Sequence, residues 1–173
     1  MKTLIIFLSL IITNAYAQES LRLIKDYGNF KQVNNIEFKI PKKLKAVFDV
    51  YTTNDDNDKT NRGINTVARF LNMHYDAGVK LKNLKSAIVI HGSAGKDVLT
   101  NSAYNKYYNI DNPNAELLKK LHDNGVRIII CGQTAAFRGF EEGEILDFVD
   151  VSLSAITALV SLQAQGYGVI NFN

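Results

Sequence analysis

The stretch VRIIICGQTAAFRG, residues 126–139, guides the interpretation of the rest of the chain. Its first half is a run of β-branched residues, which favour an extended strand. Its second half begins with Gly132 and continues with small residues, a composition that suits a tight turn into a helix. The stretch therefore predicts a strand that ends at Cys131 and leads directly into a helix.

Runs of the same kind recur along the chain. Near-continuous apolar segments lie at 45–51, 86–92 and 167–172, and a weaker one lies at 147–153. Continuous hydrophobicity, in contrast to alternation, is typical of strands that are covered on both faces, as in parallel sheets. We therefore expect five strands in a mainly parallel sheet.

Helices are expected between these strands, at 61–78, 97–108, 112–125 and 153–166. Asn112 is placed to cap the third of them, with Pro113 at its first helical position. The last one is apolar around most of its circumference, so it lies either deep in the fold or at an oligomer contact. The order of elements predicts a three-layer α/β/α sandwich around the sheet.

The N-terminal residues have the composition of a cleavable secretory signal. Residues 1–17 contain Lys2, a short apolar run and the small residues Ala15 and Ala17. The apolar run is shorter than the roughly 20 residues needed to span a bilayer. We expect a periplasmic or secreted bacterial protein without membrane attachment after cleavage, the alternative being a retained anchor. Residues 18–43 are expected to form an N-terminal arm with a short strand near 36–40, and residues 44–173 one α/β domain.

Charge and cysteine content narrow the classes of function. The formal charge of +3 falls to +2 when residues 1–17 are removed, and no basic block remains, so nucleic acid is not an expected partner. The chain has one cysteine, which excludes an internal disulfide. In an oxidising compartment such a thiol is buried, paired between chains, or used chemically.

Three predicted strands end in polar or reactive side chains, namely Asp49, His91 and Cys131. Ligands of parallel sheets bind at the carboxyl ends of the strands, so we expect these side chains to lie at the candidate site. Asp49 stands in an apolar strand and needs a partner, for which Arg62 and Arg69 are candidates. Backbone N–H groups are further candidate partners, and a structural role for Asp49 is favoured over a catalytic one.

The position of Cys131 favours a reactive thiol. The N–H groups and the dipole of the following helix lower the pKa of such a cysteine from ~8.5 toward ~7 or below. His91 is able to pair with the thiolate, donate a proton or orient a ligand. The alternatives are that Cys131 fills space under the helix and that His91 bonds a loop carbonyl.

Other motifs do not support a cofactor. The segment GSAGKD at 92–97 lacks the spacing of a phosphate-binding loop, and the acidic segment 55–58 lacks the Gly and Glu of a calcium loop. Cys131 and His91 alone leave a metal site short of ligands. Neither a metal nor a cofactor is expected.

Six segments carry a family resemblance: FDV (48–50), NRGINTVARFLN (61–72), VIHG (89–92), DNPNAELLKKL (111–121), CGQTAAFRG (131–139) and SAITALVSLQAQGY (154–167). In this order they resemble the DsrE/DsrF-like family, in its branch of small exported members, from Lys45 to Phe172. The resemblance implies a three-layer α/β fold and assembly into trimers or hexamers. It also implies a place in sulfur relay, in which one cysteine carries sulfur as a persulfide. The family's carrier pattern matches Cys131, Ala135, Ala136, Arg138 and Gly139.

Two hypotheses of function follow. In the first, the protein is an exported persulfide carrier with Cys131 and His91 as candidate catalytic residues. Its candidate substrate-binding residues are Asp49, Gly92, Gly132, Gln133 and Arg138. Its partners are a sulfur donor or acceptor protein and further copies of itself in a homotrimer or hexamer. In the second, the protein is a non-catalytic oligomeric module that binds a small ligand or a protein and buries its cysteine.

Overall fold

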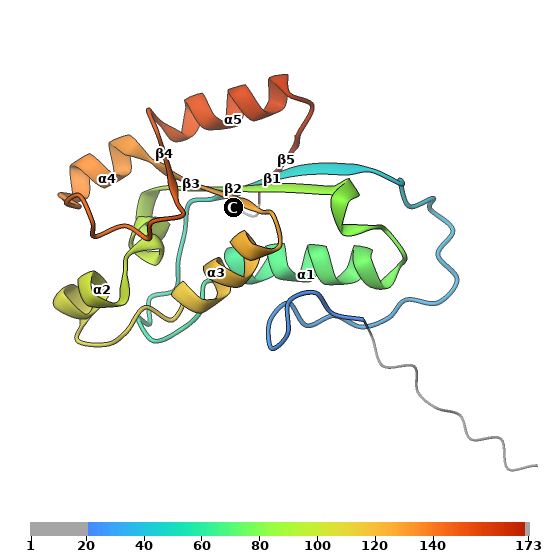
Figure 1. Cartoon of the computed structure of the whole chain (residues 1–173), viewed down its shortest axis with the longest axis horizontal. Coiled ribbons are helices and arrows are strands. Elements are labelled where there is room, and N and C mark those ends of the chain that lie inside the picture. The colour runs from blue at the N-terminus through green and yellow to red at the C-terminus, as the bar shows by residue number, and fades with distance from the viewer. Residues whose placement is uncertain (1–20, 172–173) are drawn as a thin grey trace, which may run out of the picture.

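The computed structural model describes residues 21–171, and Figure 1 shows a single sheet with helices on both of its faces. The five strands are β1 (Leu44–Val50), β2 (Leu84–Ile90), β3 (Arg127–Cys131), β4 (Asp150–Ser152) and β5 (Gly168–Asn171). They form one sheet in the order β4-β3-β2-β1-β5, and every pair is parallel. The α/β fold class with a five-stranded parallel sheet is thus confirmed. The weakest predicted strand, 147–153, is reduced to the three residues of β4 at one edge.

Alternate residues of the strands pack against different layers of helices. On one face, Phe48, Ile88 and Ile130 pack in the larger core cluster together with α1 (Arg62–Asp76) and α3 (Ala115–Asp123). On the other face, Val47 and Val89 pack with α5 (Ala155–Ala164) in a smaller cluster. Figure 1 shows α5 above the sheet and α1 with α3 below it. This arrangement is the three-layer sandwich that the sequence predicts.

The remaining helices differ in their bounds from the sequence-based expectation. They are the 3-10 helices η1 (Leu81–Asn83) and η2 (Gly92–Val98) and the α-helices α2 (Asn101–Tyr108) and α4 (Gly132–Arg138). The expected helix at 97–108 is divided, because a 3-10 turn ends at Val98 and α2 begins only after its cap Thr100. Helix α3 begins at Ala115, two residues after Pro113. Asn112 instead donates to the carbonyl oxygens of Asp97 and Leu99 and so fastens the start of α3 to η2.

Residues 21–43 run along α1 and contain no strand, so the short strand expected near 36–40 is wrong. Asn72 of α1 is fully buried, accepts a hydrogen bond from the backbone N–H of Ile24, and donates to the carbonyls of Ile24 and Tyr27. These bonds hold the first part of the arm on α1, whereas residues 36–39 are exposed and pair with no strand of the sheet. The arm is therefore held by side-chain hydrogen bonds and the buried side chain of Ile24.

Helix α5 has one buried face and one exposed apolar face. Ala155, Ala158 and Leu162 are buried against the sheet, whereas Ile156 and Val160 are 74% and 59% exposed. Of the two alternatives that its apolar sequence left open, deep burial in the fold is thus excluded. Among residues 21–171, no helix is long and apolar enough to cross a lipid bilayer.

Candidate functional site

Polar side chains form a row across the carboxyl ends of the strands, on the face covered by α5. Cys131 of β3 is the register partner of Ser152 in β4, and Asp49 of β1 is the partner of Asn171 in β5. His91 follows β2 directly, just as Cys131 follows Ile130, the partner of Ile90. The expected convergence of Asp49, His91 and Cys131 on one edge of the sheet is therefore present in the structure.

Cys131 lies where the N-termini of two helices meet. Helix α4 begins at the next residue, and α5 begins at Ala155 after the cap Ser154. The sequence indicated the first of these helix ends but not the second, because α5 reaches the thiol only through the turn after β4. The side chain of Cys131 is packed with Ile129 and Ala158, and the residue is only 5% exposed.

The surroundings of Cys131 hold its pKa below the ordinary value of a thiol. Burial raises this pKa, but hydrogen-bonding groups around the sulfur lower it by more: the N–H and hydroxyl of Thr134 and the N–H groups of Ala155 and Gln133. The Cys131 side chain does not cap α4 with a hydrogen bond, and the positive end of the helix dipole also favours a negative charge on the sulfur. The arrangement stabilises a thiolate.

Two glycines of the candidate site are explained by close packing. A Cβ atom on Gly132 would collide with the carbonyl oxygen of Ser152, so only glycine lets α4 start this close to β4. Gly92 has φ +59, and a Cβ there would collide with the ring of Tyr51. Their effect on the site is to let the backbone of the two loops approach neighbouring segments.

His91 is held on the side of the site away from β3. Its Nε2 lies 2.7 Å from Oδ1 of Asp49, and its ring contacts the ring of Tyr51 edge-on at 5.0 Å between centroids. The other carboxylate oxygen of Asp49 accepts a hydrogen bond of 3.1 Å from Nδ2 of Asn171. In the described part of the chain no ion pair joins Asp49 to Arg62 or Arg69, the partners considered from the sequence.

The side chains of Arg138 and Gln133 donate hydrogen bonds to backbone carbonyls of neighbouring loops. Nε of Arg138 donates to the carbonyl oxygen of Gly92 at 3.0 Å, and Nε2 of Gln133 donates to the carbonyl of Leu153 at 3.4 Å. Both residues, with Gly92 and Thr134, line a shallow depression of about 440 Å³. The guanidinium therefore braces the turn after β2 and contributes a positive charge to this depression.

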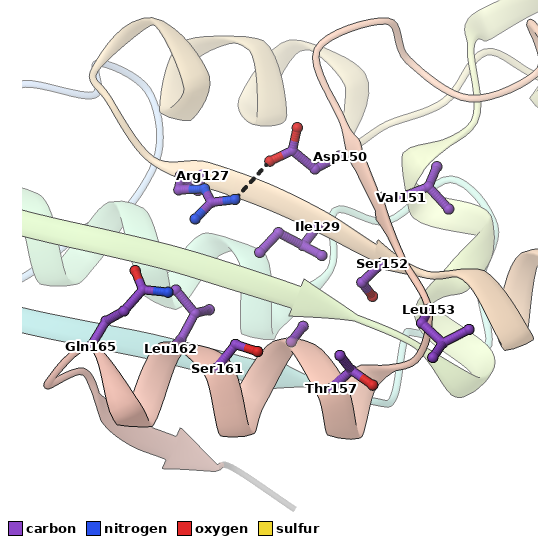
Figure 2. A pocket seen from close by; sticks show the side chains of 11 residues that line it. Arg127, Ile129, Asp150, Val151, Ser152, Leu153, Thr157, Ser161, Leu162 and Gln165 are labelled. Carbon is purple, nitrogen blue, oxygen red and sulfur yellow. Dashed lines mark hydrogen bonds and ion pairs between the residues drawn. The ribbon is translucent and has the colours of Figure 1, made fainter.

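A second hollow of about 450 Å³ opens between the β3–β4 edge and α5. Figure 2 shows Ile129 and Ser152 on its sheet side and Thr157 and Leu162 on its helix side. Its far end is closed by the ion pair of Arg127 with Asp150, in which Nη2 lies 3.1 Å from Oδ2. Two of its lining residues are neighbours of Cys131, Ile129 on the same strand and Ser152 on β4.

A buried polar cluster around Asp97 was not anticipated. Asp97 is fully buried and accepts hydrogen bonds from Asn61, Asn114 and Thr53. Burial raises the pKa of this carboxyl to about 6, against the lowering effect of its hydrogen bonds from Asn61 and Thr53. Because the partners come from separate loops, no local pattern indicates the cluster. Its contacts fasten the loops after β1 and before α3 to η2.

The described residues contain no group of three or more His, Cys, Asp or Glu side chains placed to hold a metal ion. The groups that act on the Cys131 sulfur are the hydroxyl of Thr134 and the backbone N–H groups of Gln133, Thr134 and Ala155. What the site offers chemically is a buried thiol with donors aimed at its negative form.

Comparison with known proteins identifies the family. Residues 45–172 match the DsrE/DsrF-like family, so the chain belongs to that family. A solved structure of similar fold is that of the protein of unknown function MTH1491 from Methanobacterium thermoautotrophicum. It is 20% identical with a TM-score of 0.51, over 75% of this chain and 99% of that one. The YchN protein of E. coli is 14% identical with a TM-score of 0.49, over 75% and 99% of the two chains. Curated protein sequences give no match.

Proposed function

We propose that this protein is a sulfur carrier that holds a sulfane sulfur atom on Cys131 as a persulfide. The observation that carries the proposal is the position of the thiol between the N-termini of α4 and α5, where donors from both helices lower its pKa. Membership of the DsrE/DsrF-like family supports it, because that family is often linked to sulfur relay.

The nucleophile of the proposed reaction is the thiolate. The thiolate of Cys131 attacks a sulfane sulfur of a polysulfide, a new S–S bond forms, and the old S–S bond breaks to release a hydrosulfide or shorter polysulfide. A second thiolate, from an acceptor protein, later attacks the outer sulfur and regenerates the Cys131 thiolate. A lowered pKa raises the fraction of Cys131 that is thiolate, which is the nucleophile in the loading step. It also makes Cys131 a better leaving group in the transfer step. The low exposure of Cys131 protects the persulfide from solvent.

The test of this proposal is the alkylation rate of native protein as a function of pH. We expect iodoacetamide to modify Cys131 with an apparent pKa below the ~8.5 of an ordinary cysteine, because the thiolate is the reactive form and the helix donors stabilise it. Mass spectrometry follows the modification. Alkylation only after unfolding would instead support the alternative, a non-catalytic binding module with a buried cysteine.

The proposal includes a homo-oligomer, a trimer or hexamer, in which an exposed apolar surface is covered. This surface, here called the α5 patch, consists of Val151, Leu153, Ile156 and Val160, all exposed. Apolar surface of this kind on one side of a soluble domain marks an interaction site. Val151 and Leu153 of the patch also line the hollow of Figure 2, so assembly would enclose that hollow.

Ile156→Glu and Val160→Glu are expected to dissociate the oligomer into folded monomers. A carboxylate in a desolvated interface lacks a partner, whereas on the free surface it is hydrated. Multi-angle light scattering at micromolar concentration measures the mass. Asn105→Glu, at an exposed position of α2 away from the α5 patch, is the matched control and should leave the mass unchanged. Leu162→Glu should unfold the protein, because Leu162 is 2% exposed inside the domain. A monomeric wild type would contradict the proposal.

We also propose that the protein is exported, on the basis of the signal-like residues 1–17, which lie outside the described residues. Protein taken from the cell envelope should then have the intact mass of a chain that begins at Gln18. A full-length chain found in the cytosol would contradict export and the oxidising setting assumed for the thiol.

A further inference from the structure

The most unusual charged group of the sheet is Asp49. It lies between the buried residues Phe48 and Val50 in a central strand, and its side chain is only 12% exposed. Both of its oxygens are engaged, Oδ1 with Nε2 of His91 at 2.7 Å and Oδ2 with Nδ2 of Asn171 at 3.1 Å. A charge at such a position costs free energy unless it is paired, so its partners define its role.

The pairing determines where His91 carries its proton. A carboxylate only accepts hydrogen bonds, so Nε2 of His91 must be the nitrogen that bears hydrogen. In the neutral imidazole this leaves Nδ1 as a lone pair that is able to accept a proton. The edge-on ring of Tyr51 packs against the imidazole and limits its rotation.

The register places His91 and Cys131 at adjacent positions on neighbouring strands, with Nε2 of His91 turned toward Asp49 of β1. Ile90 of β2 and Ile130 of β3 are register partners. His91 follows Ile90 and Cys131 follows Ile130, so both lie on the face covered by α5. Neighbouring strands are about 4.8 Å apart, so the two side chains start from adjacent positions. Of the two nitrogens of His91, only Nδ1 is left to exchange a proton at the sulfur.

We propose that Asp49 is a positioning residue that fixes His91 in its Nε2–H tautomer, so that Nδ1 moves the proton during sulfur loading of Cys131. This inference rests on the proposed persulfide function. Nδ1 takes the proton of the Cys131 thiol, and the thiolate forms the S–S bond to the sulfane sulfur. The proton then passes from the imidazolium to the departing hydrosulfide. The imidazolium is stabilised meanwhile by the Asp49 carboxylate, and charge and protons balance over the cycle.

Asn171 makes the proposal sharply testable, because it fixes which way an amide at position 49 would face. In Asp49→Asn the carbonyl oxygen is expected to accept from Nδ2 of Asn171, as Oδ2 of Asp49 does. The new NH₂ group then points at Nε2 of His91 and donates to it. Nε2 must become the acceptor, and the hydrogen moves to Nδ1, where it blocks proton acceptance.

The first experiment is ¹⁵N NMR of the imidazole groups in the full chain at a pH where His91 is neutral. Wild type should show the Nε2–H tautomer for His91, with the signal assigned by its loss in His91→Ala. Asp49→Asn should show the Nδ1–H tautomer. The wild-type spectrum requires no substitution at Asp49, so an Nδ1–H tautomer there overturns the proposal even if Asp49→Asn does not fold.

The second experiment is the initial rate of sulfur uptake from polysulfide, followed by mass spectrometry. Asp49→Asn and His91→Ala should each slow uptake about 10- to 100-fold while the final load stays at one sulfur, because a general base assists a thiol that reacts slowly without it. The double variant should be no slower than either single variant, since both remove the same step. Asp49→Glu keeps a carboxylate and should recover part of the rate.

Asp123→Asn, in an exposed ion pair at the end of α3, is the control and should load at the wild-type rate. Equal rates for wild type and Asp49→Asn would overturn the positioning role and leave the carrier function standing. Additive losses in the double variant would also overturn it, because two independent structural defects add. A wild type that takes up no sulfur would overturn both proposals.

Discussion

Replacing Cys131 with serine is expected to abolish sulfur uptake completely. On treatment with polysulfide, wild type should gain about 32 Da, the mass of one sulfur atom, and a reductant should remove it. Serine has nearly the same volume but cannot form a persulfide, and its hydroxyl is not ionised near neutral pH, so the N–H groups of Thr134 and Ala155 have no anion to stabilise. Intact-mass spectrometry of native protein gives the result directly.

Two controls test whether the reactivity of Cys131 depends on its folded surroundings or is that of an ordinary thiol. The serine variant should keep the wild-type unfolding midpoint, since Cys131 makes no disulfide and its packing volume is preserved. Wild type unfolded in urea should react more slowly at pH 7 than native protein, because unfolding disperses the donors that favour the thiolate. Uptake by the serine variant, or faster uptake by the unfolded chain, would contradict the proposed site.

The second large effect is expected from Gly132→Ala. The added Cβ would collide with the carbonyl oxygen of Ser152, which is backbone and part of β4, so β4 or the start of α4 must move. Overpacking of this kind costs about 1–3 kcal/mol of unfolding free energy, and the displaced donors should also raise the pKa of Cys131. Urea unfolding and the pH dependence of alkylation measure the two effects.

Gly168→Ala is the matched control for that substitution. Gly168 also lies in a strand of the sheet, but a Cβ there meets only the carbonyl oxygen of Lys45 at 3.8 Å, an ordinary contact distance. This variant should change the unfolding free energy by less than about 0.5 kcal/mol. If both variants were equally stable, the close approach of Gly132 to β4 would not be a constraint on the site.

The strands and the position of the thiol could be predicted from sequence because they depend on local patterns. Continuous apolar runs identify strands buried on both faces, and parallel strands bring their carboxyl ends to one edge. Cys131 and His91 were therefore placed correctly relative to the sheet. The helix after Cys131 could be read from Gly132 and the small residues that follow it.

The remaining features depend on contacts that no local pattern records. The N–H of Ala155 reaches Cys131 only because β4 is short and α5 turns back over the sheet. Asn171 meets Asp49 through the pairing of the first and last strands. Leu162 has the same apolar character as Ile156, and only the direction in which α5 faces the sheet decides which is buried. Sequence periodicity fails there because the helix is apolar on both sides.

The strand order has a consequence for when the site forms. β1 lies between β2 and β5, and the bond from Asn171 to Asp49 joins residues 122 positions apart. Contacts of such high sequence separation form late and slowly in folding. Consider a chain in which strands β1, β2, β3 and β4 have assembled but β5 has not yet docked. In such a chain Cys131 and His91 are in place, while Asp49 lacks its second partner, Asn171. We expect the site to form in two stages, with the environment of the Cys131 thiol completed before the Asp49–His91 pair is fixed. Folding intermediates should therefore react readily with iodoacetamide but take up sulfur slowly.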